Sequence, residues 1–145
     1  MNWLSVNRNG LGKASLEPRE ARFSIGLISD HESYLRLKLN ASSGHGLDDA
    51  KSMMAAFDSI NPGSRPRPVV ADVCDISVGA TSEARAYYAQ VLLPKHFGPT
   101  AIVTSSVGQR LLGSFFVIVN RPAISVRFFT DEEEALRWLI NEAAG

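Results

Sequence analysis

The sequence predicts an α/β domain with a mixed, mostly parallel five-stranded sheet and four helices, in the order ββαβαβαβα. Two early segments, 23–27 and 35–39, alternate apolar and polar residues, as strands with one buried face do. Three later apolar runs, 69–73, 100–104 and 124–129, are each followed by a helical pattern. Because strand–helix–strand crossovers are right-handed, we expect these later strands to be parallel.

The two early strands are joined by the short polar link 29–33, which predicts an antiparallel hairpin. Residues 1–20 contain mainly turn-forming and charged residues, so they are expected to form an N-terminal arm. The domain proper is then 21–145. A chain of 145 residues suits this single-domain organisation.

Four helices follow from apolar residues at helical spacing. The first covers 47–60 and ends at Asn61-Pro62-Gly63. The second begins at Thr81 and is expected to stop at Pro94. The third, 106–119, is apolar around much of its girth. The fourth begins with Thr130-Asp131-Glu132-Glu133, a pattern that predicts a capping box with Thr130 as the cap.

The stretch 68–90 carries a family resemblance. Asp72 lies in a buried strand, and Ala80-Thr81-Ser82-Glu83 opens the next helix. Together with the order of elements over residues 21–145, this resembles STAS domains, known from bacterial anti-sigma-factor antagonists. In such antagonists an Asp-Ser-Ser-Gly motif stands at this helix start, and one of its serines accepts phosphate from a partner kinase. The resemblance therefore implies a bacterial regulatory module that switches between protein partners.

This chain departs from the motif at two positions. Ala80 replaces the acid and Glu83 replaces the glycine. A carboxylate beside the acceptor hydroxyl would repel an incoming phosphoryl group. The chain is more similar to small bacterial proteins described as STAS-like or CRAL-TRIO-like and largely uncharacterised. Runs like 83–88 and 129–139 recur in that group, and they specify the fold more than the function.

The best candidate site is the start of the second helix, where four polar residues are expected to form a rim for a partner or an anion: Ser77, Thr81, Ser82 and Arg85. Free backbone N–H groups at a helix N-terminus attract negative charge. Two of these residues also have a simpler interpretation than a contact with a partner. Thr81 would cap the helix in any case, and Arg85 would be an ordinary solvated surface side chain.

The helix 106–119 has more apolar surface than one sheet face requires. Its residues Leu112, Phe115 and Phe116 would line a pocket for an apolar ligand or form the face of a homodimer. We favour the homodimer, because the 15 basic and 15 acidic residues cancel and leave no net charge to keep two copies apart. The same neutrality argues against binding to nucleic acid or to an anionic membrane.

Other chemistries find no support in the sequence. No Gly-x-Ser-x-Gly elbow, phosphate-binding loop or spaced set of metal ligands is present, so we predict no enzyme, no metal and no cofactor. His31 and His45 lie in predicted loops and are expected to be exposed. Cys74, the single cysteine, is expected to be an inert thiol at the end of a buried strand.

The expected location is the cytoplasm. The first residues lack the basic and apolar regions of a signal peptide, and the longest apolar run, 115–119, is too short to insert into a membrane. The sequence thus predicts a non-enzymatic, STAS-like regulatory module that binds an unidentified protein partner. The alternative is a small carrier or sensor of an apolar, lipid-like ligand.

Overall fold

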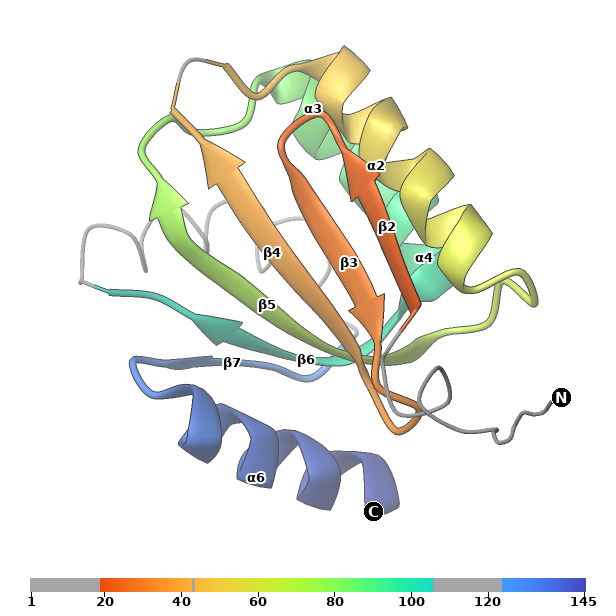
Figure 1. Cartoon of the computed structure of the whole chain (residues 1–145), viewed down its shortest axis with the longest axis vertical. Coiled ribbons are helices and arrows are strands. Elements are labelled where there is room, and N and C mark those ends of the chain that lie inside the picture. Colours follow the sequence, from red (N-terminus) through yellow and green to blue (C-terminus); the bar gives the residue numbers. More distant parts are fainter. Residues whose placement is uncertain (1–18, 43, 106–123) are drawn as a thin grey trace, which may run out of the picture.

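The computed structural model describes residues 19–42, 44–105 and 124–145. Within them, one six-stranded sheet has its strands in chain order (Figure 1). The strands are β2 (Arg19–Phe23), β3 (Gly26–Asp30), β4 (Leu35–Ala41), β5 (Arg67–Ile76), β6 (Phe97–Val103) and β7 (Val126–Phe129). Strands β2 to β4 are antiparallel, and β4 to β7 are parallel. The parallel pairing predicted for the three later strands is confirmed.

The prediction of five strands is wrong, because segment 23–27 belongs to two strands rather than one. Phe23 pairs with Gly26 across a tight turn formed by Ser24 and Ile25. A Cβ atom at Gly26 would lie 2.1 Å from the carbonyl oxygen of Lys38, so only glycine fits where β3 meets β4. Strand β2 begins at Arg19, so residues 19–20 of the expected arm belong to the sheet.

The first predicted helix is confirmed as α2 (Leu47–Ile60). The second is a continuous helical segment made of α3 (Ser82–Tyr87), the π-helix η1 (Tyr88–Leu92) and α4 (Leu93–His96). The predicted stop at Pro94 is therefore wrong. A proline within a helix removes one backbone donor, and the wide π turn just before it, with Leu93 N–H bonded to the Tyr88 carbonyl, accommodates this loss.

The last helix, α6 (Glu132–Ala144), starts one residue later than predicted. Its cap is Asp131, whose Oδ2 accepts a hydrogen bond from the Glu134 N–H at 3.3 Å, and not Thr130. The Thr104 N–H donates to the Phe129 carbonyl, which extends the sheet pairing to the end of β7. Aspartate caps a helix as well as threonine does. The helix predicted at 106–119 lies outside the described residues.

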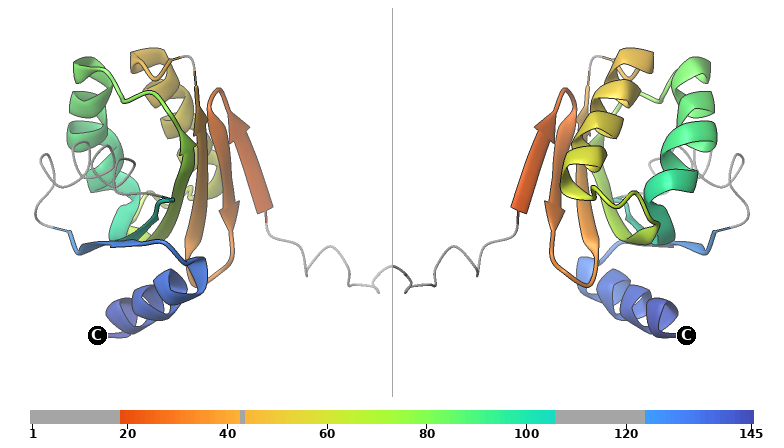
Figure 2. Two further views of the ribbon diagram at one scale, coloured as in Figure 1. Left: turned by 90° about the vertical axis from the view of Figure 1, so that its left-hand side faces the viewer. Right: turned by 90° about the vertical axis from the view of Figure 1, so that its right-hand side faces the viewer.

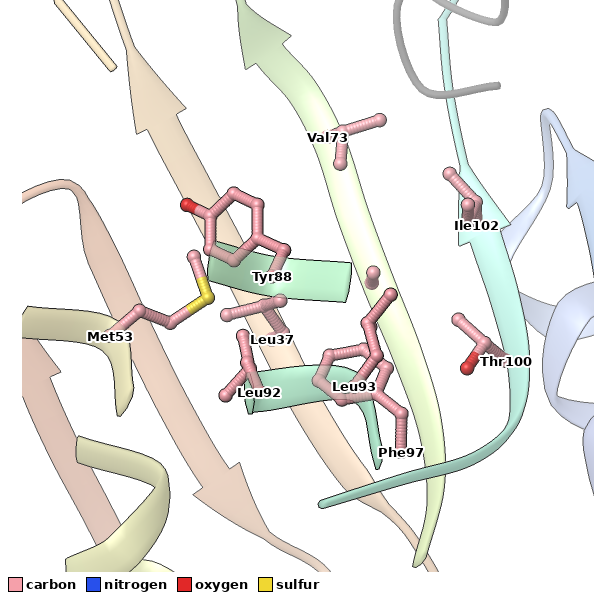
Figure 3. A pocket seen from close by; sticks show the side chains of 10 residues that line it. Leu37, Met53, Val73, Tyr88, Leu92, Leu93, Phe97, Thr100 and Ile102 are labelled. Atoms are coloured by element: carbon pink, nitrogen blue, oxygen red, sulfur yellow. The ribbon is translucent and has the colours of Figure 1, made fainter. Parts of the chain in front are cut away.

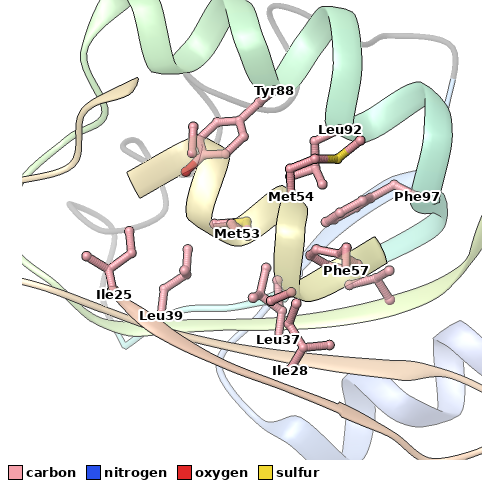
Figure 4. Packing of buried hydrophobic residues seen from close by; sticks show 14 of the residues in the cluster. Ile25, Ile28, Leu37, Leu39, Met53, Met54, Phe57, Tyr88, Leu92 and Phe97 are labelled. Carbon is pink, nitrogen blue, oxygen red and sulfur yellow. The ribbon is translucent and has the colours of Figure 1, made fainter. Parts of the chain in front are cut away.

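The helices form two layers of unequal size on the sheet. Figure 2 shows α2 and the α3–η1–α4 segment on one face and α6 on the other. We call these the α2 face and the α6 face. The α2 face holds most of the buried apolar side chains, which come from α2, from the α3–η1–α4 segment and from the sheet, above all from alternate residues of β4 and β5. Its largest members include Ile28, Leu37, Leu39, Met53, Phe57, Tyr88, Leu92 and Phe97 (Figure 4).

The α6 face has a much smaller core, formed by Val70, Ala101, Val103, Ala135 and Leu139. Beside it, charged side chains join the helix to the sheet. The Arg36 guanidinium on β4 donates to both carboxylate oxygens of Glu132 at 2.8 and 2.9 Å and to Asp72 at 3.2 Å. Lys38 also contacts Asp72, at 3.3 Å. We call these four residues the charge cluster.

Candidate functional site

The predicted rim lies at the carboxyl ends of β4 and β5, where residues 44–46 and loop 77–81 meet. The Ala41 carbonyl accepts hydrogen bonds from the N–H groups of Ser77 and Val78, and the Thr81 N–H donates to the His45 carbonyl at 3.0 Å. Backbone bonds from two directions therefore hold loop 77–81 in one place. The side chains of Ser77, Thr81 and Ser82 are exposed along it.

Thr81 and Ser82 differ in what their hydroxyl groups do. Thr81 is the N-cap of α3, and its Oγ1 accepts a hydrogen bond from the Ala84 N–H at 3.1 Å. The predicted capping role of Thr81 is thus confirmed. Ser82 is the first residue of the helix and is exposed. The Ser82 hydroxyl does not cap the helix, so it is more available than the Thr81 hydroxyl for a contact with a partner.

Arg85 is half-buried and folds back over the loop. Its Nη1 donates to the Ala80 carbonyl at 2.7 Å, and its Nη2 lies 3.5 Å from the Ser82 hydroxyl. The structure therefore brings Thr81, Ser82 and Arg85 together, while Ser77 lies at the other end of the loop, with its hydroxyl 3.4 Å from the Ala41 carbonyl. Arg85 therefore supports the loop through its hydrogen bond to the Ala80 carbonyl.

His45 lies beneath the rim, which contradicts its predicted exposure. The side chain is only 3% exposed, and Nε2 is hydrogen-bonded to the hydroxyl of Tyr88, which is 1% exposed. Burial lowers the pKa of His45 and raises the pKa of Tyr88, so both groups are neutral at physiological pH. His31 was also expected to be exposed, but it is half-buried, and its ring stacks on that of Tyr34 with 4.9 Å between the ring centroids.

A cavity of about 20 Å³ lies between the sheet and the α3–η1–α4 segment (Figure 3). Described residues that line it are Leu37, Met53, Ala71, Val73, Tyr88, Leu92, Leu93, Phe97, Thr100 and Ile102. Its volume suffices for about one water molecule, whereas ligand pockets measure roughly 300–1,000 Å³. In this form the cavity is too small for a lipid-like ligand. The pocket residues predicted from the sequence, Leu112, Phe115 and Phe116, lie outside the described residues.

Two further properties concern the described ranges 19–42, 44–105 and 124–145 only. In these ranges no three His, Cys, Asp or Glu side chains are grouped so that they could hold a metal ion. None of the helices found there is long and apolar enough to cross a membrane. Cys74 is half-buried near the end of β5, and burial beside Asp72 raises the pKa of its thiol, which keeps it protonated.

Comparison with known proteins identifies the family. The model of a family described as "Domain of unknown function (DUF7793)" matches residues 32–142, which is most of the chain. The chain belongs to this family. No curated protein matches it.

The DUF7793 chain is also similar to a solved structure, an uncharacterized protein of the DUF3478 family with a SpoIIAA-like fold from Shewanella loihica PV-4. The two share 21% sequence identity with a TM-score of 0.56, and the match covers 90% of this chain and 99% of the other. At this identity the likeness shows the fold alone. The STAS-like architecture predicted from the order of elements is therefore supported, apart from the number of strands.

Sequence reasoning missed the buried polar residues of this DUF7793 domain. His96 is fully buried, with Nε2 2.9 Å from Asp58 and Nδ1 2.9 Å from the Asn61 amide nitrogen. Asp58 and Asn61 stand at the end of the first helical pattern, next to the stop signal Asn61-Pro62-Gly63. The charge cluster was missed as well, because Arg36 and Glu132 are 96 residues apart. No local pattern relates such distant residues.

Proposed function

We propose that this DUF7793 domain is a non-enzymatic, STAS-like binding module whose contact surface is the rim at the start of α3. The observation that carries the proposal is the presentation of Ser82. Its exposed hydroxyl stands at the first turn of a helix, directly after a loop that is held by backbone hydrogen bonds and by Arg85. A surface that is already ordered loses little conformational entropy when a partner binds.

The charges around Ser82 favour a protein partner over a free anion. Glu83 is exposed beside it, and the nearest cation, Arg85, already donates to the Ala80 carbonyl. An anion would be repelled by the carboxylate and would have to compete for the guanidinium. A partner that presents uncharged hydrogen-bonding groups meets neither obstacle, so we expect the rim to bind such a protein and to exchange one partner for another as antagonists of the STAS type do.

Site-specific crosslinking tests the proposal. The full chain, with a photoreactive amino acid at position 82, is added to a lysate of the source cells and should give a discrete crosslinked species. This species should be lost when purified wild-type protein is added as competitor. The Ser82→Asp protein should compete poorly, because it adds charge beside Glu83. Ser59, exposed near the other end of α2, provides the matched control: Ser59→Asp should compete like wild type.

The crosslinking result is interpretable only if both variants fold, which circular dichroism decides. If Ser82→Asp and Ser59→Asp compete equally well, the rim is not the contact surface and Thr81 serves only as a helix cap. If position 59 gives the same crosslinked species as position 82, the partner binds elsewhere on the domain.

The alternative function is a carrier or sensor of an apolar ligand. The entirely apolar surface of the cavity favours it, although the present volume of about 20 Å³ does not admit such a ligand. Native mass spectrometry of freshly purified protein distinguishes the two functions. A carrier should retain a bound mass, whereas a partner-binding module should be empty.

The proposed homodimer is tested by sedimentation velocity. The expectation rests on the net charge of zero and on the apolar helix predicted at 106–119. We expect twice the chain mass of 15.8 kDa at micromolar concentration. Sedimentation at 15.8 kDa at high concentration would remove the dimer from consideration.

A further inference from the structure

The helical segment over the cavity has the features of a weakly held cover. Tyr88, Leu92 and Leu93 form its inner side and line the cavity (Figure 3). The turn from Tyr88 to Leu92 is a π-helix, and Pro94 follows it. Both features reduce regular helical hydrogen bonding. The unfilled space beneath also deprives the lining side chains of packing contacts, so lifting this segment costs less than lifting a fully packed helix.

A histidine holds each end of this cover. At one end, His45, which lies just before α2, is hydrogen-bonded to the Tyr88 hydroxyl. At the other end, His96 is the last residue of α4. Its Nε2–H donates to Asp58 Oδ1 at 2.9 Å, and its Nδ1 accepts from Asn61 Nδ2 at 2.9 Å. The same Asn61 nitrogen donates to the Arg65 carbonyl at 2.9 Å.

These bonds suit a neutral imidazole at His96. A proton on Nδ1 would point at the Asn61 NH₂ group, so that two donors would face each other. Rotating the Asn61 amide would relieve this conflict, but it would leave the Arg65 carbonyl without the donor that it now has. The imidazole is fully buried and stacked on Phe57 at 5.3 Å, so water cannot replace the lost bond without displacing the cover.

The charged groups near the two imidazoles do not reverse this preference. Asp58, on α2, favours a charged His96, while Lys95, its neighbour in α4, opposes it. Asp49, on α2, favours a charged His45. Burial outweighs these contributions and lowers the pKa of both histidines below the ordinary value of 6.5.

We propose that the segment from Tyr88 to His96 is a pH-released cover: a proton on His96 sets two donors against each other at Asn61, a proton on His45 places a charge in the buried space beside Tyr88, and both favour a state in which the segment lifts from the apolar floor of the cavity. This device is independent of any partner at the rim. The sign follows from proton binding. The closed state keeps both imidazoles neutral, and the released state binds additional protons, so the closed state loses stability as the pH falls below 6.5.

Fluorescence of bis-ANS, a dye that binds exposed apolar surface, tests the proposal on the full chain. Acidification from about pH 7.5 to about pH 5, the range in which histidine changes charge, should raise the fluorescence several-fold while far-UV circular dichroism retains most of the helical signal. A His45→Gln/His96→Gln double variant cannot be charged at these positions and should lose this response. His31→Gln is the matched control, because His31 holds neither end, and it should respond like wild type.

Three results would overturn the proposal: no dye response from folded wild type, an equal response from the double variant, or loss of the response in His31→Gln alone. If the double variant fails to fold, NMR titration of the imidazole nitrogens in the wild-type protein still decides. Both buried histidines should titrate below pH 6.5, together with the dye response. Titration of either one at or above 6.5 overturns the proposal.

Discussion

The two faces of the sheet are held to their helices by different forces. On the α2 face, α2 and the α3–η1–α4 segment bury a large apolar core, and ion pairs lie at its border. There Arg67 and Arg19 meet Asp30 at 3.0 and 2.8 Å, and Lys95 meets Asp58 at 3.0 Å. On the α6 face the apolar core is small, and the charge cluster lies between the helix and the middle of the sheet.

This difference shows how one sheet attaches helices in two ways. Apolar burial contributes roughly 25 cal/mol per Å² and is insensitive to salt, so the α2 face should supply most of the stability of the domain. Partly exposed ion pairs contribute little each, but their geometry is specific. The bidentate bond from Arg36 to Glu132 therefore fixes where α6 begins on the sheet more than it stabilises the helix.

The largest expected effect distinguishes the two cores. Phe57→Ala should lower the free energy of unfolding by about 3–5 kcal/mol, because it leaves a cavity in the centre of the larger core. Leu139→Ala should cost about 2 kcal/mol, the lower end for such a change, since α6 can settle onto the sheet. Urea unfolding measures both, with the 52% exposed Ile140→Ala as a control near zero. Equal losses for Phe57 and Leu139 would contradict the comparison.

The next effect concerns the ion pairs of Asp30 on the α2 face. Arg67 and Arg19 lower the pKa of the nearly buried Asp30 from 3.8 to about 2. Because the folded pKa is the lower one, the stabilisation is complete above pH 3.8 and is lost as the pH falls towards 2. Asp30→Asn should therefore cost about 2 kcal/mol at neutral pH.

Urea unfolding at neutral pH and at about pH 2 measures this dependence. The cost of Asp30→Asn should shrink at the lower pH, where the wild-type carboxylate is itself becoming protonated. A cost that is the same at both pH values would show that Asp30 acts through shape and not through charge. Asp75→Asn is the control, since that carboxylate is 56% exposed and should matter less.

A smaller effect is expected in the charge cluster. A double-mutant cycle with Arg36→Met and Glu132→Gln should give a coupling free energy of about 1 kcal/mol. The coupling should fall as salt is raised from about 0.1 M to about 1 M, because the screening length shortens from about 10 Å to about 3 Å. Urea unfolding at both salt concentrations measures it. A coupling that does not change with salt would mean that packing, and not charge, joins α6 to the sheet.

The smallest effects concern the helix caps, one on each face. Thr81→Ala and Asp131→Ala should each cost about 1 kcal/mol, because each removes the acceptor for a first-turn N–H. Thr130→Ala should change stability by less than about 0.5 kcal/mol, since Thr130 is not the cap. Denaturant midpoints decide between these positions. A loss at Thr130 with none at Asp131 would restore the capping box expected from the sequence.

Local patterns in the sequence were sufficient where neighbouring residues alone determine the structure. The period of apolar residues placed α2 correctly, the hydroxyl before a helical pattern identified Thr81 as a cap, and three apolar runs gave the parallel strands. For the candidate site, the same patterns placed Thr81 and Ser82 at a helix start. The functional role of the rim stays a prediction, as does any role of Leu112, Phe115 and Phe116.

By itself, the sequence determined the fold class and most elements, because periodicity and helix caps depend on residues only a few positions apart. The tertiary structure alone decided the features that depend on distant contacts. The chain turns at Ser24 and Ile25 and starts a separate strand at Gly26, where the Lys38 carbonyl of β4 leaves no room for a Cβ atom. His45 and His96 are buried against partners on η1 and α2, and Arg36 meets Glu132 only once the sheet has formed. Such contacts join residues by their places in the sheet, which no spacing along the chain records.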